Sequence, residues 1–119
     1  MITSPIVGIY RITITRQDIV SMPARSGDRG TYTIIFRDDS TYMLTKNGPS
    51  GTIVFGYYLV SQGELSLTDT RSCGSLWNAP TGTYSWALKG NMLILQAQDE
   101  GCLDRQFVLE SHPLLRQGA

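Results

Sequence analysis

The sequence has neither an excess of charge of one sign nor a long apolar run. Ten Lys and Arg residues balance ten Asp and Glu residues, so no long-range field draws the chain to nucleic acid or to an anionic membrane. The longest apolar stretch, residues 52–60, is too short to span a bilayer and is rich in β-branched and aromatic residues, which favour strands. We therefore expect a soluble protein without a membrane span and without a nucleic-acid partner.

Reactive side chains are also few. The chain has one histidine, His112, and two cysteines, Cys73 and Cys102. No catalytic or metal-binding motif stands out, so no cofactor is expected. Residues 1–5 lack the basic and apolar regions of a signal peptide. A disulfide would suit an extracytoplasmic chain whose leader has been removed, whereas free thiols would suit a cytoplasmic chain that starts natively at Met1.

A repeated triplet is the strongest pattern in the chain. Gly-x-Tyr opens an alternating apolar run three times, and a close relative occurs at residues 56–58; the three copies are Gly8-Ile9-Tyr10, Gly30-Thr31-Tyr32 and Gly82-Thr83-Tyr84. Alternating runs separated by turn residues are typical of half-buried antiparallel strands. With 41% apolar content, the 119 residues suffice for a single domain with its own core, spanning 1–119.

These runs predict an all-β fold, an eight-stranded antiparallel up-and-down β-barrel with at most one short helical turn between strands 1 and 2. The strands are expected at 7–15, 30–37, 41–46, 52–60, 64–69, 82–88, 92–97 and 105–110. Successive connections in such a barrel lie at alternate ends. Short turns then close one end, and the four long loops gather at the other, where binding sites usually lie; these loops are 16–29, 47–51, 70–81 and 98–104.

Alternation also assigns side chains to the barrel interior. The expected inward set contains the tyrosines of the triplets, Phe55, Tyr57 and Leu59 of the fourth strand, and Phe107 and Leu109 of the eighth. An eight-stranded barrel is just wide enough to be filled by side chains or to hold one small ligand. Because the inward residues are large, any cavity is expected to be small.

Four segments carry a family likeness, and the first contains a triplet that is similar to the lipocalin Gly-x-Trp, with Tyr10 in place of Trp. The segments are 5–19, 82–86, 99–105 and His112-Pro113. On these residues the chain resembles the small bacterial lipocalin-like domains of the calycin superfamily, whose function is unassigned. The resemblance implies a lipocalin-like barrel over most of the chain.

Six residues are candidates for contact with a ligand in the barrel or at its mouth. Arg105 is expected to point inward at the long-loop end, where it either grips an anionic ligand or forms a salt bridge to Asp99 or Asp104. Trp77 lies in a long loop, where it either plugs the barrel mouth or contacts a ligand. The full set of candidates is Tyr32, Phe55, Trp77, Tyr84, Trp86 and Arg105.

The cysteines are expected to pair. Cys73 and Cys102 lie in connections at the same end of the barrel, so we predict a disulfide that contributes about 3 to 4 kcal/mol and restrains the loop that carries Trp77.

The sequence favours a binding protein over an enzyme. The first hypothesis is that a small apolar or amphipathic ligand binds in the barrel or at its mouth. One alternative is a protein-binding or inhibitory surface domain that uses the loop rim. Another is a cofactor-free cyclase or isomerase that uses the barrel interior.

Overall fold

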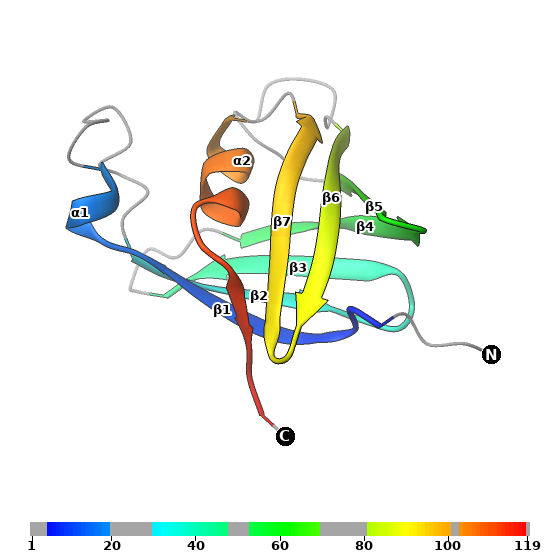
Figure 1. The fold of residues 1–119 in the computed structure, drawn as a ribbon, viewed down its shortest axis with the longest axis horizontal. Helices are drawn as coiled ribbons and strands as arrows, with labels where there is room; N and C mark the ends of the chain where they lie inside the picture. Colours follow the sequence, from blue (N-terminus) through cyan, green and yellow to red (C-terminus); the bar gives the residue numbers. More distant parts are fainter. Residues whose placement is uncertain (1–4, 20–29, 48–52, 70–80, 101–102, 119) are drawn as a thin grey trace.

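Eight strands in chain order form a closed antiparallel barrel in the computed structural model (Figure 1). The structure describes residues 5–19, 30–47, 53–69, 81–100 and 103–118. The strands are β1 (Gly8–Ile14), β2 (Gly30–Phe36), β3 (Thr41–Lys46), β4 (Ile53–Ser61), β5 (Glu64–Asp69), β6 (Thr81–Lys89), β7 (Met92–Asp99) and β8 (Leu114–Arg116). The described residues also contain two helices, α1 (Arg16–Ile19) and α2 (Leu103–Glu110). The predicted eight-stranded up-and-down barrel is confirmed, and α1 is the expected helical turn.

Three short turns close one end of the barrel. The β4–β5 and β6–β7 turns require a positive φ, which Gly63 (77°) and Gly90 (61°) adopt without strain. In the β2–β3 turn, the Asp39 carboxylate accepts hydrogen bonds from the backbone N–H and the hydroxyl of Thr41, at 3.1 and 2.6 Å. These bonds lower the pKa of Asp39 below its ordinary value. The turns fall where the sequence predicts them.

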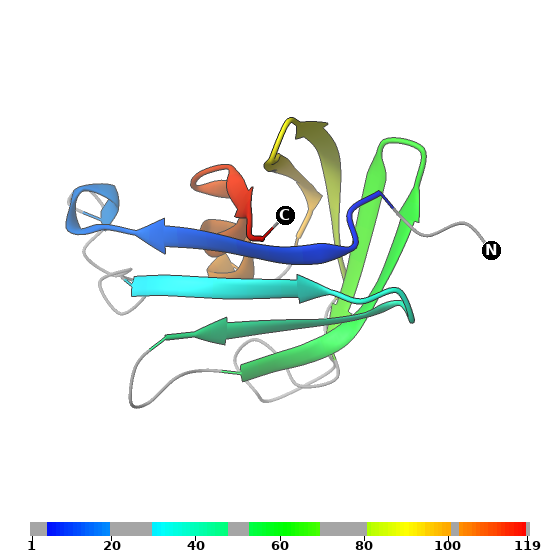
Figure 2. The same cartoon turned by 90° about the horizontal axis from the view of Figure 1, so that it is seen from below.

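The core lies between the two layers of the barrel. Figure 2 shows β1, β2 and β3 side by side as one layer, and Figure 1 shows β6 and β7 crossing above it. The triplet tyrosines point into the core as expected: Tyr10 and Tyr84 are fully buried and Tyr32 is 6% exposed.

The inward face of β4 differs from the prediction. Phe55, Tyr57 and Leu59 are 42, 56 and 71% exposed, whereas Gly56 and Tyr58 are buried. Both faces of this strand are apolar, so alternation of polarity cannot distinguish them. The Gly-x-Tyr pattern does distinguish the two faces, because Tyr58 takes the same inward position as the other triplet tyrosines. Gly56 lies opposite Tyr42, another buried residue.

The predicted strand at 105–110 is wrong, because these residues belong to helix α2. Val108 and Leu109 are both buried, and adjacent residues can both face a core from a helix but not from a flat strand. Gln106 also donates a hydrogen bond to Glu110, at 3.3 Å, across one helical turn. The eighth strand starts later, after Pro113.

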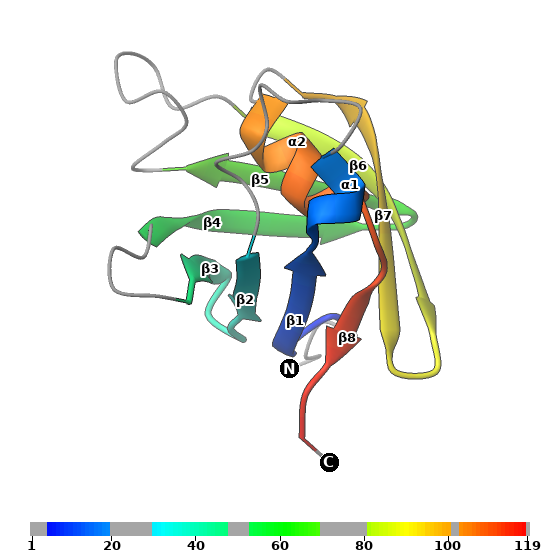
Figure 3. The same cartoon turned by 90° about the vertical axis from the view of Figure 1, so that its left-hand side faces the viewer.

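Helix α2 takes the place of a longer eighth strand. Strand β8 pairs only with residues 10–11 of β1 and 92–93 of β7. Further along β7, the backbone N–H of Ala97 donates instead to the carboxylate of Glu110, at 2.7 Å. Figure 3 shows α2 between β1 and β7. A helix therefore fills the gap in the barrel wall at the long-loop end.

Candidate functional site

The short-turn end of the barrel is filled by aromatic rings. The Phe36 ring centroid lies 5.1 Å from that of Tyr58 and 6.0 Å from those of Tyr10 and Tyr42. The Tyr58 hydroxyl donates to the carbonyl of Arg37 at 2.5 Å. Burial raises the pKa of Tyr58, and the nearby carboxylates of Asp39 and Asp38 raise it further. This packing is structural, since it leaves these rings almost no accessible surface.

Arg116 completes the same end. Its guanidinium lies 5.3 Å from the centroid of the Tyr10 ring, and its Nη2 donates to the carbonyls of Pro5 and Val7 and to the Tyr10 hydroxyl, at 2.8, 3.1 and 2.8 Å. Burial raises the pKa of Tyr10, and the positive charge of Arg116 partly opposes this shift. A Cβ at Gly8 would lie 3.1 Å from the Arg116 Nε, so glycine makes room for the guanidinium. Arg116 thereby ties β8 to the segment before β1.

At the long-loop end, a lysine lies over the Tyr32 ring. The Lys46 Nζ is 5.7 Å from the ring centroid, within the range of a cation–π interaction. Lys46 shares the inward parity of Tyr42 and Leu44 on β3. Gly30 has a φ of 145°, and a Cβ there would lie 2.9 Å from the Lys46 Cε. The second triplet therefore also accommodates a cation over its tyrosine.

An acidic residue contacts the tyrosine of the third triplet. The Tyr84 hydroxyl donates to the carboxylate of Glu100, which follows the end of β7. The strand order puts the start of β6 and the end of β7 at the same end of the barrel as the start of β2 and the end of β3. One cation and one anion thus accompany inward tyrosines at the long-loop end.

The structure places two of the predicted ligand contacts at the long-loop end and others elsewhere. Tyr32 and Tyr84 are buried near the long-loop end. Phe55 lies on the outer surface of the barrel, so it cannot line the interior. Trp86 packs against the core and donates from Nε1 to the carbonyl of Ser61, at 3.3 Å, close to the β4–β5 turn.

The remaining predicted site residues cannot be placed from the described part of the chain. Trp77, Cys73 and Cys102 lie outside the described residues, so the disulfide stays a prediction. Arg105 falls within α2, but its side chain also lies outside the described part. Lys46 and Glu100 were not among the sequence candidates. The sequence pattern could have indicated Lys46, because this residue lies two positions after Leu44 and therefore points inward at the end of the same strand.

The described interior is filled. Twelve large side chains have less than 2% of their surface accessible, among them Ile34, Leu67 and Leu93 at 0%. Residues that lined a ligand-sized space would retain accessible surface toward it, so these residues line no such space. The largest remaining exposures in the buried core, 6% each, are at Tyr32 and Leu44. Both lie next to Lys46, at the long-loop end.

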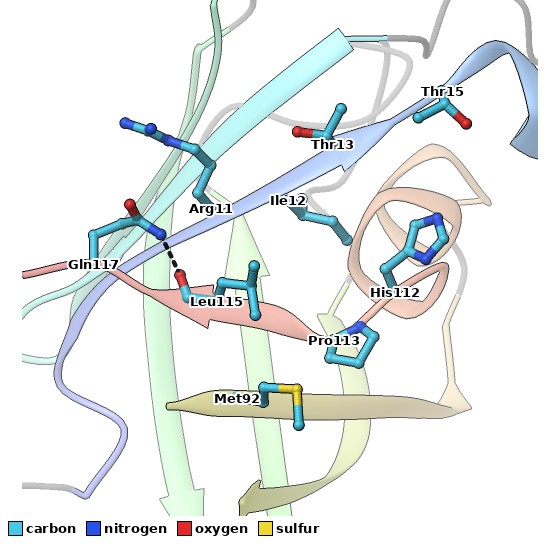
Figure 4. A pocket seen from close by; sticks show the side chains of 9 residues that line it. All are labelled: Arg11, Ile12, Thr13, Thr15, Met92, His112, Pro113, Leu115 and Gln117. Carbon is cyan, nitrogen blue, oxygen red and sulfur yellow. Dashed lines mark hydrogen bonds between the residues drawn. The ribbon is translucent and has the colours of Figure 1, made fainter. Parts of the chain in front are cut away.

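A groove of about 420 Å³ lies on the outer surface, where β8 is short (Figure 4). Apolar side chains meet polar ones around it; the lining residues are Arg11, Ile12, Thr13, Thr15, Met92, His112, Pro113, Leu115 and Gln117. The Gln117 side chain donates to the carbonyl of Leu115 at 2.8 Å. Sequence reasoning missed this groove because it placed the eighth strand too early.

Neither a metal centre nor a membrane helix emerges from the described ranges. No three His, Cys, Asp or Glu side chains are grouped there to hold a metal ion. No described helix is long and apolar enough to cross a bilayer. No protein-family model matches the chain, and no curated protein or solved structure was found to be similar to it.

Proposed function

We propose that this chain is a small lipocalin-like binding domain that takes an amphipathic ligand at the long-loop end of its barrel. The observation that carries the proposal is that Lys46 and Glu100 accompany the inward tyrosines at this end, whereas aromatic rings fill the other. The filled interior favours a ligand at the mouth over one enclosed in the barrel. It also gives no support to a cyclase or isomerase acting in the interior.

The charges suggest which ligand fits. The Glu100 carboxylate already accepts a hydrogen bond from Tyr84. The Lys46 ammonium carries a positive charge at this end and lies beside Tyr32 and Leu44, two apolar members of the core that are each 6% exposed. A ligand with a carboxylate head and an apolar chain would pair its head with Lys46 and place its chain against these two side chains.

Calorimetric titration with dodecanoate tests this proposal, using Lys46→Met as the variant and Lys89→Met as its matched control. Lys89 is exposed and lies at the β6–β7 turn, at the opposite end. Methionine keeps the apolar stem of lysine and removes the charge. Loss of a hydrogen bond to a charged group typically costs about 1.5 to 3 kcal/mol, so Lys46→Met should raise the Kd at least about tenfold. Lys89→Met should match the wild type. Absence of binding, or equal loss in both variants, would refute the proposal.

The outer groove favours a second candidate, the binding of an extended peptide segment. The backbone N–H of Gln117 donates to the carbonyl of Ile9 at 2.7 Å, so the N–H and C=O groups of Ile9 face β8. Residues two apart in a strand direct these groups to the same side, so the backbone groups of Thr13 face the groove. When the β1–β8 register is extended, Pro113 stands opposite Thr13. Proline has no backbone N–H that could donate to Thr13. An added strand could use this edge of β1.

Panning a peptide display library tests the second candidate. Peptides with alternating apolar residues should be retained by the wild type and lost with Leu115→Arg, which introduces charge into the groove. Leu59→Arg, a change at a more exposed position on β4, is the control. Retention of the same peptides by the Leu115 variant would exclude the groove.

A further inference from the structure

The outer face of the sheet from β1 to β4 carries a row of apolar side chains that crosses these four strands. The strand register places Ile9 opposite Ile35 and Ile35 opposite Met43. Met43 in turn lies opposite Phe55 on β4. Directly opposed side chains in antiparallel strands lie about 4.5 to 5.5 Å apart at Cβ, so these four form one continuous stripe.

The stripe continues along β4. We call the whole set the outer apolar row; its members are Ile9, Ile35, Met43, Phe55, Tyr57 and Leu59. Four of them are 42 to 71% exposed. Given the size of such side chains, these four leave on the order of 500 Å² of apolar surface in contact with solvent, toward the upper end for a monomer's largest patch. Outward positions of a half-buried sheet are normally polar, so this row is unusual.

Along its strands this face carries little charge, and the exposed Arg37, Asp38 and Asp39 of the β2–β3 turn lie at its edge. Arg11 is the single charged residue at the outward positions of β1 to β4, within the described strands. The row that runs beside the apolar one pairs Arg11 with Thr33, and Thr33 with Thr45. Aromatic and apolar side chains combined with few charges are characteristic of the central part of protein interfaces.

We propose that this face is the interface of a two-fold symmetric dimer of this chain. An apolar face with little charge matches another of the same kind, and a second copy of the chain supplies one. Two copies do not repel each other at long range, because the net charge is zero. Two sheets stack face to face at a spacing of about 10 Å.

Two copies of the row, about 1,000 Å² together, reach the lower bound of the area that a specific interface buries. A standard interface buries about 800 Å² on each partner. The outer apolar row provides on the order of 500 Å², and the neighbouring threonines and Arg11 extend the same face across the sheet. In a two-fold dimer the row of one copy lies against the row of the other. The proposal is independent of the ligand site, since the row is on the outside of the barrel.

Sedimentation equilibrium of the full chain, from low to high micromolar concentration, tests the proposal. The wild type should dimerise. The double variant Tyr57→Lys, Leu59→Lys places like charges against each other across the two-fold axis, so its dimer Kd should rise at least about a hundredfold. Gln96→Lys, an exposed change on β7, should leave the Kd unchanged.

A second variant separates loss of the interface from loss of the fold. Tyr57→Thr, Leu59→Thr keeps residues that favour strands and should also weaken the dimer, while circular dichroism and melting temperature stay close to wild type. A wild type that is monomeric at high micromolar concentration would overturn the proposal, whichever other partner then binds this face. A dimer that both double variants leave intact would overturn it as well.

Discussion

The two ends of the barrel share one local arrangement, a cation over the tyrosine of a Gly-x-Tyr triplet, but we assign different roles to them. At each end, a Gly-x-Tyr glycine makes room for a cationic side chain that lies over the tyrosine ring. Arg116 covers Tyr10 at the short-turn end, and Lys46 covers Tyr32 at the long-loop end. The guanidinium makes three hydrogen bonds to acceptors of the segment before β1 and of Tyr10, and its planar geometry is one that an ammonium lacks. The arginine end is therefore structural, and the lysine end is suited to binding.

The largest expected effect concerns the aromatic packing at the structural end. Phe36 is 1% exposed and contacts three other rings, so Phe36→Ala should lower the free energy of unfolding by about 3 to 5 kcal/mol. Urea denaturation measures this loss. Gln96→Ala, at an exposed position on β7, should change it by no more than about 0.5 kcal/mol. A loss below about 1 kcal/mol for Phe36→Ala would mean that the rings are loosely packed.

Removal of the two cations compares the ends directly. Arg116→Met leaves the buried Tyr10 hydroxyl and two carbonyls without their donor, so it should cost about 2 to 4 kcal/mol. Lys46→Met removes a cation from the edge of the barrel and should cost less than about 1 kcal/mol. Chemical denaturation of both variants gives the two values. Equal costs would contradict the assignment of different roles to the two ends.

The glycines that make room for the cations give a smaller effect. Gly30→Ala should cost about 1 to 3 kcal/mol, because its φ of 145° is unfavourable for alanine and because the new Cβ would lie 2.9 Å from the Lys46 Cε. Combining it with Lys46→Ala should recover part of this cost by removing the steric contact. A double-mutant cycle without coupling would show that Lys46 does not lie over Gly30.

Alkaline pH should weaken the structural end slightly. Burial raises the pKa of Tyr58 above its ordinary 10.0, so the folded protein holds this proton more tightly than the unfolded chain does. The resulting stability is fully present below pH 10.0 and is lost as the pH rises through the folded pKa. Tyr58→Phe should make the free energy of unfolding less dependent on pH in this range. An unchanged slope would contradict the link between burial and pKa.

Most of the barrel could be predicted from the sequence because alternation and turn glycines act locally. Seven of the eight strands lie close to their expected positions. The prediction failed where the local pattern was ambiguous: β4 is apolar on both faces, and the segment around Val108 and Leu109 fits a strand as well as a helix. Only the packing of α2 against β7 and β1 decides in favour of the helix.

The candidate site was less accessible to sequence reasoning. The triplets correctly placed Tyr32 and Tyr84 in the interior. Their charged neighbours depend on strand pairing: Lys46 meets Tyr32 through the β2–β3 register, and Glu100 reaches Tyr84 across the β6–β7 pair. The outer groove depends on where β8 begins, which follows from the extent of α2.

The central claim is that the long-loop end binds the ligand and the short-turn end does not. A heteronuclear NMR titration of the wild type with dodecanoate tests this most directly, because it reports on both ends in one sample. We predict that signals of Tyr32, Lys46 and Tyr84 shift with dodecanoate concentration while those of Tyr10 and Phe36 stay in place. Shifts confined to Tyr10 and Phe36, or no shifts at all, would contradict the account.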